Sequence, residues 1–287
     1  MGAVPRPPHQ DDRVEAGFGD RGGYFPDSAS AKAYASKAVQ SDYGRDRVRA
    51  VKALVEGVSL AGANVVDFGG GDGSFVAELG IDFARLVLID VSPDMLGLAE
   101  DFIEHEKLTT LCGSEEMMGE LANESIDLIL CINAINYLET ESQERFFAEA
   151  HRVLRSGGHL LVMTGNELLD LFSLNSGTAE FFEKNFGSDV APLLVSGSEE
   201  RWVNAGRFNP LSFGAVVAKY GFRELKQAYS QWHEVPPGLA ALNAKGDLPA
   251  ARLAARNHAL NPNELPNESG WQALFRCSMF ASLCRKA

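Results

Sequence analysis

Hydrophobic residues along this chain form short continuous runs that alternate with segments of helical spacing. The runs typical of strands are 64–68, 86–90, 108–112, 126–131 and 159–163. The segments typical of helices are 45–57, 74–79, 92–103 and 140–154. Strands that are apolar on both faces are typical of a parallel sheet that helices cover on each side. The pattern therefore predicts an α/β fold with a doubly wound, mostly parallel sheet.

Local signals set several of the expected boundaries. Ser92 and Pro93 are a typical helix start, with a capping hydroxyl and a proline in the first turn, and this helix is expected to run to residue 103. Thr140 and Gln143 have the spacing of a capping box. The segment 156–158, Ser-Gly-Gly, is expected to end the helix that begins there.

The alternation of strands and helices is less regular in the second half of the chain. A helix is expected at 210–220, and two more strands at 222–232 and 271–283 bring the predicted sheet to seven strands. Two segments lack the hydrophobic pattern of strands, 165–207 and 236–269. We interpret them as insertions that cap the active face.

The domain organisation follows from these segments. Residues 1–26 are rich in proline and glycine and are expected to form a disordered leader. Residues 27–287 are expected to form a single domain, with its core at 42–164 and its last helix and strands within 208–287.

Composition and charge narrow the function. The chain of 287 residues is 45% hydrophobic and 23% charged, which excludes wholesale disorder. A formal net charge of −13 argues against nucleic acid as a partner, because nucleic-acid binders need a basic face. No apolar run approaches the roughly 20 residues of a membrane helix. We therefore expect a small-molecule substrate and no membrane partner.

Cysteine usage points to the compartment. The four cysteines form no CxxC pair, so neither a metal site nor a disulfide framework is expected, and a reducing cytoplasm fits best. Cys112 and Cys131 each end an apolar run, where a buried thiol is expected.

A glycine loop directly follows the first predicted strand. Gly69, Gly71 and Gly73 have GxGxG spacing, which allows a tight turn and lets a ligand lie against bare backbone. The dinucleotide fingerprint GxGxxG fails, because its third glycine would fall at Ser74. A nicotinamide oxidoreductase is therefore disfavoured.

Acidic residues surround this loop. Asp67 and Asp72 favour a ligand with a cationic end, such as an amino group or a sulfonium. Asp90 ends the second strand, where a carboxylate can accept both hydroxyls of a ribose.

Together these residues resemble the class I S-adenosylmethionine-dependent methyltransferases. Four motifs occur in the family's order, VVDFGGGDG at 65–73, LIDVSPDML at 88–96, SIDLILCIN at 125–133 and RVLRSGGHL at 152–160. Each is weak alone, but their order and spacing are specific together. The resemblance implies a Rossmann-like fold, S-adenosyl-L-methionine as cofactor, and methyl transfer.

The resemblance also implies residue roles on the cofactor. Asp67 would orient the methionine amino group, and the three glycines would let the methionyl and ribose parts approach. Asp90 would bind the ribose hydroxyls, with Val91 and Met95 on either side of the adenine. Asn133 would lie near the methionyl group.

The adenine side departs from the family pattern. Members often carry an acidic residue after the third strand, whereas this sequence has Ser114 there, followed by Glu115. Either of these residues could read the adenine amino group.

The acceptor side is less defined. His233, after the sixth strand, is the first candidate for a general base, with a surface histidine as the alternative. Tyr137 is expected to line the acceptor pocket. The leading hypothesis is methyl transfer to an oxygen or nitrogen of a small molecule, such as a sugar or natural-product intermediate. A non-catalytic S-adenosylmethionine-binding protein is the alternative.

Overall fold

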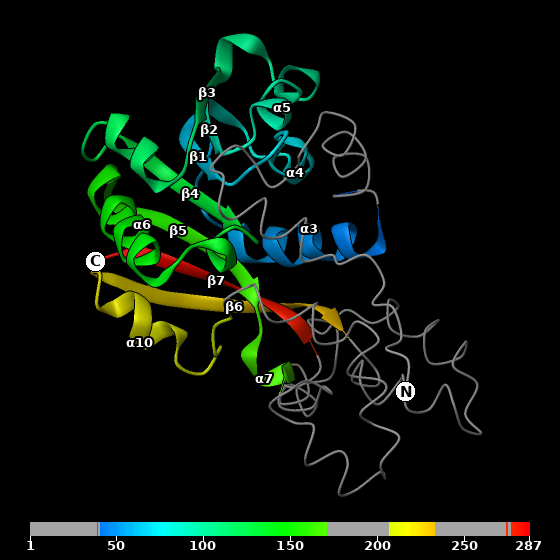
Figure 1. Ribbon diagram of the computed structural model, residues 1–287, viewed down its shortest axis with the longest axis vertical. Coiled ribbons are helices and arrows are strands. Elements are labelled where there is room, and N and C mark those ends of the chain that lie inside the picture. The colour runs from blue at the N-terminus through cyan, green and yellow to red at the C-terminus, as the bar shows by residue number, and fades with distance from the viewer. Residues whose placement is uncertain (1–38, 40, 171–206, 233–273, 275–276) are drawn as a thin grey trace, which may run out of the picture.

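The computed structural model describes residues 39, 41–170, 207–232, 274 and 277–287 (Figure 1). The predicted leader 1–26, the insertion 236–269 and most of the insertion 165–207 lie outside the described residues. His233 also lies outside them, one residue beyond the end of the sixth strand. Within the described part of the chain, no helix has both the length and the apolarity to cross a bilayer.

The described residues form a seven-stranded sheet with the order β3-β2-β1-β4-β5-β7-β6. The strands are β1 Ala63–Phe68, β2 Phe83–Asp90, β3 Leu108–Cys112, β4 Ile126–Ile132, β5 Leu154–Gly165, β6 Phe222–Trp232 and β7 Cys277–Lys286. Strands β1 to β5 are parallel to one another, and β7 pairs antiparallel with both β5 and β6. The predicted mostly parallel, doubly wound sheet is therefore confirmed.

Helices cover both faces of the sheet. The helices are α3 Asp42–Val55, α4 Ser74–Leu79, α5 Pro93–Leu96, α6 Thr140–Val153, α7 Glu167–Asp170 and α10 Phe213–Ala218. Short 3-10 turns connect them, at η1 Ala99–Asp101, η2 His105–Lys107, η3 Glu115–Glu120 and η4 Ile135–Tyr137. In Figure 1, α3, α4 and α5 lie on one side of the sheet, and α6 and α10 lie on the other.

Alternation along the strands divides the core into two halves. Val65 and Leu128 face α3 and α4, and their neighbours Val66 and Ile129 face α6 and α10. Because helices shield both sides, β1, β4 and β5 are apolar on both faces, as the sequence pattern predicted.

Two helix boundaries differ from expectation. Helix α5 ends at Leu96 instead of residue 103, because the backbone reaches Gly97 and continues as a separate 3-10 turn. Phe102 lies beyond this short helix and is 48% exposed. The cap of α6 is Glu139, so the predicted Thr140–Gln143 capping box is wrong. The Gln143 side chain instead donates to the carbonyl oxygens that precede the helix.

The predicted turn at 156–158 is part of β5. Leu154 pairs with Ile126, and pairing resumes between His159 and Leu128. The residues between form an irregularity in the strand, and Gly157 takes a φ of 75° there. The expected Ser-Gly-Gly stop is thus a bulge at the amino end of a strand.

Candidate functional site

The carboxyl ends of β1 to β4 lie next to one another along one edge of the sheet, because these strands are adjacent and parallel. The strand order reverses between β1 and β4, which is where ligands of open α/β sheets bind. The predicted residues follow this edge, with Asn133 after β4, Asp67 in β1, Asp90 in β2 and Ser114 after β3. The structure therefore brings together residues that lie as far apart in the sequence as Asp67 and Asn133.

The glycine loop between β1 and α4 is tightly confined. Gly69, Gly71 and Gly73 take φ values of 67°, 60° and 74°, which other residues rarely adopt. A Cβ atom at Gly69 would lie 2.3 Å from the Cβ of Ala134, and one at Gly71 would lie 2.8 Å from Met95 Cε. The loop therefore needs glycine both for its conformation and for its close neighbours.

The Asp90 carboxylate anchors this loop from the neighbouring strand. Its Oδ2 accepts from the Gly71 backbone N–H at 2.9 Å, and its Oδ1 accepts from the Ser92 N–H at 2.9 Å. Burial raises the pKa of Asp90, and these backbone donors oppose that rise. Each carboxylate oxygen still has a lone pair for a further donor such as a ribose hydroxyl.

Two further carboxylates are buried here, one at the end of β1 and one within the loop. Asp67 is 1% exposed and Asp72 is 3% exposed. Among the described residues, neither Asp67 Oδ2 nor Asp72 Oδ2 has a hydrogen-bond partner. Burial, together with the charges of Asp90 and Asp72, raises the pKa of Asp67 to about 7. Asp72 Oδ1 accepts from Ser74, from the backbone N–H at 3.1 Å and from the hydroxyl at 2.7 Å, so the unsatisfied acceptors are the two Oδ2 atoms. Buried acceptors of this kind suit a cationic ligand that supplies the missing donors.

The end of β3 carries a pair of polar residues in contact with α6. The Ser114 hydroxyl donates to Glu115 Oε2 at 2.7 Å, and Arg145 donates to Glu115 Oε1 from Nε at 3.0 Å and from Nη2 at 2.7 Å. Hydrogen bonds from Ser114 and Arg145 lower the pKa of Glu115 against the desolvation that raises it. No sequence signal links Arg145 to this position, because it comes from a distant helix.

The end of β4 carries a buried polar chain that the sequence analysis missed. The Asn133 backbone has a φ of 58°, and its Oδ1 accepts from Asn136 Nδ2 at 3.0 Å. The Thr164 hydroxyl, fully buried at the end of β5, donates to Asn136 Oδ1. A pair of asparagines three residues apart just after a strand was the available sequence signal.

Other candidate residues have simpler surroundings. Tyr137 ends η4 and is 36% exposed, beside the same edge of the sheet. Cys131 is buried, as expected, whereas Cys112 is exposed because β3 is the edge strand of the sheet. The prediction of a buried Cys112 thiol is therefore wrong.

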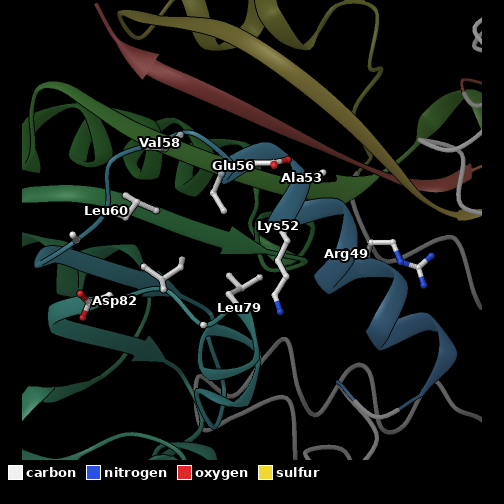
Figure 2. Close-up of a pocket in the computed structure, with 12 residues that line it drawn as sticks. Arg49, Lys52, Ala53, Glu56, Val58, Leu60, Leu79 and Asp82 are labelled. Carbon is white, nitrogen blue, oxygen red and sulfur yellow. The ribbon is translucent and has the colours of Figure 1, made fainter.

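A surface groove of about 620 Å³ lies elsewhere (Figure 2). It runs between α3 and the end of α4, where Lys52 reaches over Leu79, with Leu60 and Asp82 on the far side. Leu60 and Asp82 lie just before β1 and β2, so this groove is at the amino edge of the sheet. It contains none of the predicted site residues.

Comparison with known proteins assigns the core of the sheet to a family. Residues 66–162 match the family model described as a methyltransferase domain. A ubiquinone/menaquinone biosynthesis C-methyltransferase from Rubrivivax gelatinosus is 26% identical over 192 residues, 64% of this chain and 70% of that protein. A malonyl-[acyl-carrier protein] O-methyltransferase from Hahella chejuensis is 34% identical over 104 residues, 35% of this chain and 36% of that protein.

Solved structures share the fold at low sequence identity. A putative methyltransferase from Haloferax volcanii, in complex with the Trm112 activator, has a TM-score of 0.56 at 16% identity, over 90% of this chain and 96% of that one. A possible histamine N-methyltransferase from Thermotoga maritima has a TM-score of 0.52 at 20% identity, over 91% and 98% of the two chains. These likenesses support the architecture described above.

Proposed function

Because this chain is a class I S-adenosylmethionine-dependent methyltransferase, we propose that it methylates an oxygen or nitrogen atom of a small molecule. The observation that carries the proposal is the carboxyl edge, where buried carboxylates surround a glycine loop. Sugar and natural-product intermediates are the first acceptor classes to test. The relative from Rubrivivax gelatinosus is named for ubiquinone and menaquinone biosynthesis, which supports a small-molecule acceptor.

The acidic residues of this site fit the cofactor, S-adenosyl-L-methionine. The unpartnered Asp67 Oδ2 and Asp72 Oδ2 suit its cationic end, and Asp90 has free lone pairs for its ribose hydroxyls. Met95 lies against the glycine loop, where with Val91 it would contact the adenine. When bound, the cofactor supplies a methyl group on a positively charged sulfur.

The protein residues act by positioning and charge more than by covalent chemistry. In-line methyl transfer needs alignment of the acceptor and exclusion of water. Asn133, held by Asn136, has an engaged Oδ1, so its Nδ2 hydrogens remain to fix the methionyl end. The buried carboxylates favour the cationic ligand over its neutral product.

We also propose that the insertions 165–207 and 236–269 cover this site as parts of one domain. Strand β5 ends at Gly165 and is parallel to β4, so the first insertion begins at the carboxyl edge. Strand β6 ends at Trp232 on the same side, since both β5 and β6 are antiparallel to β7. Both insertions therefore start where the acceptor must enter.

His233 is our candidate for the general base, and Tyr137 for the acceptor pocket. His233 directly follows Trp232, the last residue of β6, which supports a position near the carboxyl edge. His233→Ala should lower turnover strongly while cofactor affinity holds, as measured by product formation and calorimetry. Unchanged turnover would remove His233 from the site.

The whole proposal is tested by cofactor binding followed by turnover. Titration calorimetry of the folded protein should show S-adenosylmethionine binding that Gly71→Arg abolishes. Release of S-adenosylhomocysteine with an oxygen or nitrogen acceptor would exclude the non-catalytic alternative, a protein that only binds the cofactor. Binding without turnover on any acceptor, including carbon acceptors, would favour that alternative instead. Mass spectrometry of the denatured protein can identify a retained acceptor.

A further inference from the structure

A row of basic side chains crosses the amino edge of the sheet, at the opposite end from the proposed cofactor site. Arg285 of β7 pairs with His159 of β5 on one side and with Arg223 of β6 on the other. Residues directly opposite in paired strands have their side chains on the same face. Leu283 and Leu161, each two residues from a member of the row, pack toward α3, so the row lies on the α3 face. We call these three residues the basic row.

The two arginines of the basic row lack ion-pair partners. Arg223 and Arg285 are exposed, and within the described part of the chain neither forms an ion pair. The next residue, Lys286, faces the other side of the sheet and does have a partner, Glu124, at 3.5 Å. Like charges directly opposite one another in a sheet are destabilising. In a chain with a formal net charge of −13, this uncompensated row therefore indicates a place for an anionic ligand.

The bulge in β5 holds the central guanidinium of the basic row. Gly157 takes a φ of 75° there, and a Cβ at this position would lie 3.0 Å from Arg285 Nη2 and 3.4 Å from its Nε. The Arg285 guanidinium therefore lies against bare backbone. Arg155 of the same bulge, in an ion pair with Asp127 at 2.6 Å, adds a further positive charge. A guanidinium has planar N–H donors that bind phosphate oxygens in pairs.

His159 responds to the same positive surroundings. Burial lowers the pKa of its ring, and the charges of Arg285 and Arg155 lower it further. Both charged groups that act on this ring from its neighbourhood are thus arginines. A bound anion would bring negative charge to this place and raise the pKa of His159 again.

We propose that the basic row binds a ligand with two linked phosphate groups. Adjacent strands lie about 4.8 Å apart, so the three side chains begin at positions that span about 10 Å. A single phosphate group is shorter than this span, whereas a diphosphate can contact more of the row. The inference goes beyond the proposed methyl transfer and does not depend on it, because the two sites lie at opposite edges of the sheet.

Titration calorimetry of the full chain with inorganic pyrophosphate tests the site. Pyrophosphate should bind at least about tenfold more tightly than inorganic phosphate, because it offers the row a second charged group. Arg285→Gln and Arg223→Gln should each weaken pyrophosphate binding by about tenfold or more. Arg85→Gln is the matched control and should keep the wild-type affinity. Arg85 is an exposed arginine at the amino end of β2, three strands away from β5, so this variant loses the same charge.

Nuclear magnetic resonance gives a second readout that a purely structural role would not change. Saturating pyrophosphate should raise the pKa of His159, and His159→Gln identifies its signal among the six histidines. Saturating S-adenosylhomocysteine should leave the affinity for pyrophosphate unchanged. Thermal unfolding without ligand checks that each variant is folded, and Arg223→Gln on the edge strand remains informative if Arg285→Gln fails to fold.

Other results would overturn the inference. Absence of pyrophosphate binding at millimolar concentration, equal affinity for phosphate, or an unchanged pKa of His159 would show that the row holds no diphosphate. Equal weakening in Arg85→Gln would indicate general charge attraction. Displacement of pyrophosphate by S-adenosylhomocysteine would place it at the glycine loop. Binding to phosphatidylglycerol vesicles that requires Arg285, without binding of pyrophosphate, would assign the row to a lipid surface instead.

Discussion

Asp67 should make the unliganded protein less stable as the pH rises. Burial and neighbouring charges raise its pKa from 3.8 to about 7 in the folded chain. Between these two values the folded chain holds a proton that the unfolded chain has released. The stabilisation is therefore complete below about pH 4 and is lost as the pH rises through about 7. A shift of roughly three pKa units corresponds to about 4 kcal/mol, with roughly 2–3 kcal/mol lost between pH 5 and pH 8.

Asp67→Asn isolates this contribution, because the amide does not titrate. Urea unfolding of both proteins at about pH 5 and pH 8 gives the variant's relative stability at each pH. From about pH 5 to about pH 8, the free energy of unfolding of the variant should rise by roughly 2–3 kcal/mol relative to that of the wild type. A constant difference arising from the buried amide does not affect this comparison. Parallel pH dependences in the two proteins would refute the assigned pKa of Asp67.

Three further predictions concern the loop, the core and the buried polar chain. Gly71→Ala should weaken S-adenosylhomocysteine binding at least tenfold in calorimetry, because φ at this position is 60° and a Cβ would contact Met95. Phe146→Ala should cost about 3–5 kcal/mol in urea unfolding, whereas the half-exposed Phe102→Ala should cost less than about 1 kcal/mol; similar costs would contradict the described core. Thr164→Val should cost about 1–3 kcal/mol and Thr164→Ser much less, and equal losses would show that the hydroxyl is not needed.

Much of the fold could be predicted because strand and helix spacing report burial directly. All seven strands were expected, although β5 begins at Leu154 instead of residue 159 and β7 begins at Cys277 instead of residue 271. Their apolar faces are explained by helices on both sides. The errors occur where a local signal competes with sheet pairing. The Ser-Gly-Gly segment has the composition of a helix stop, yet pairing of Leu154 with Ile126 extends β5 across it. Exposure of Cys112 depends on β3 being an edge strand, which spacing alone does not reveal.

The site was predictable where its residues sit at strand ends. Asp67, Asp90 and the glycines could be found because parallel strands bring their carboxyl ends to one edge. Arg145 could not, because its role depends on how α6 packs beside η3. The role of the Thr164 hydroxyl could not be predicted either, since a threonine in a strand is ordinary until its partner in η4 is known. His233 stays a prediction.

The placement of β7 between β5 and β6 constrains the order in which the sheet can assemble. Strand β6 precedes β7 in the chain, yet it reaches the sheet only through β7. Pairing of β6 with β7 closes the segment that joins them, residues 233–276, and long closures slow folding. Until β7 docks, β5 presents an unpaired apolar edge. The interval before β7 docks is therefore when this protein is most exposed to self-association, and stabilising the β6–β7 hairpin should improve its refolding yield.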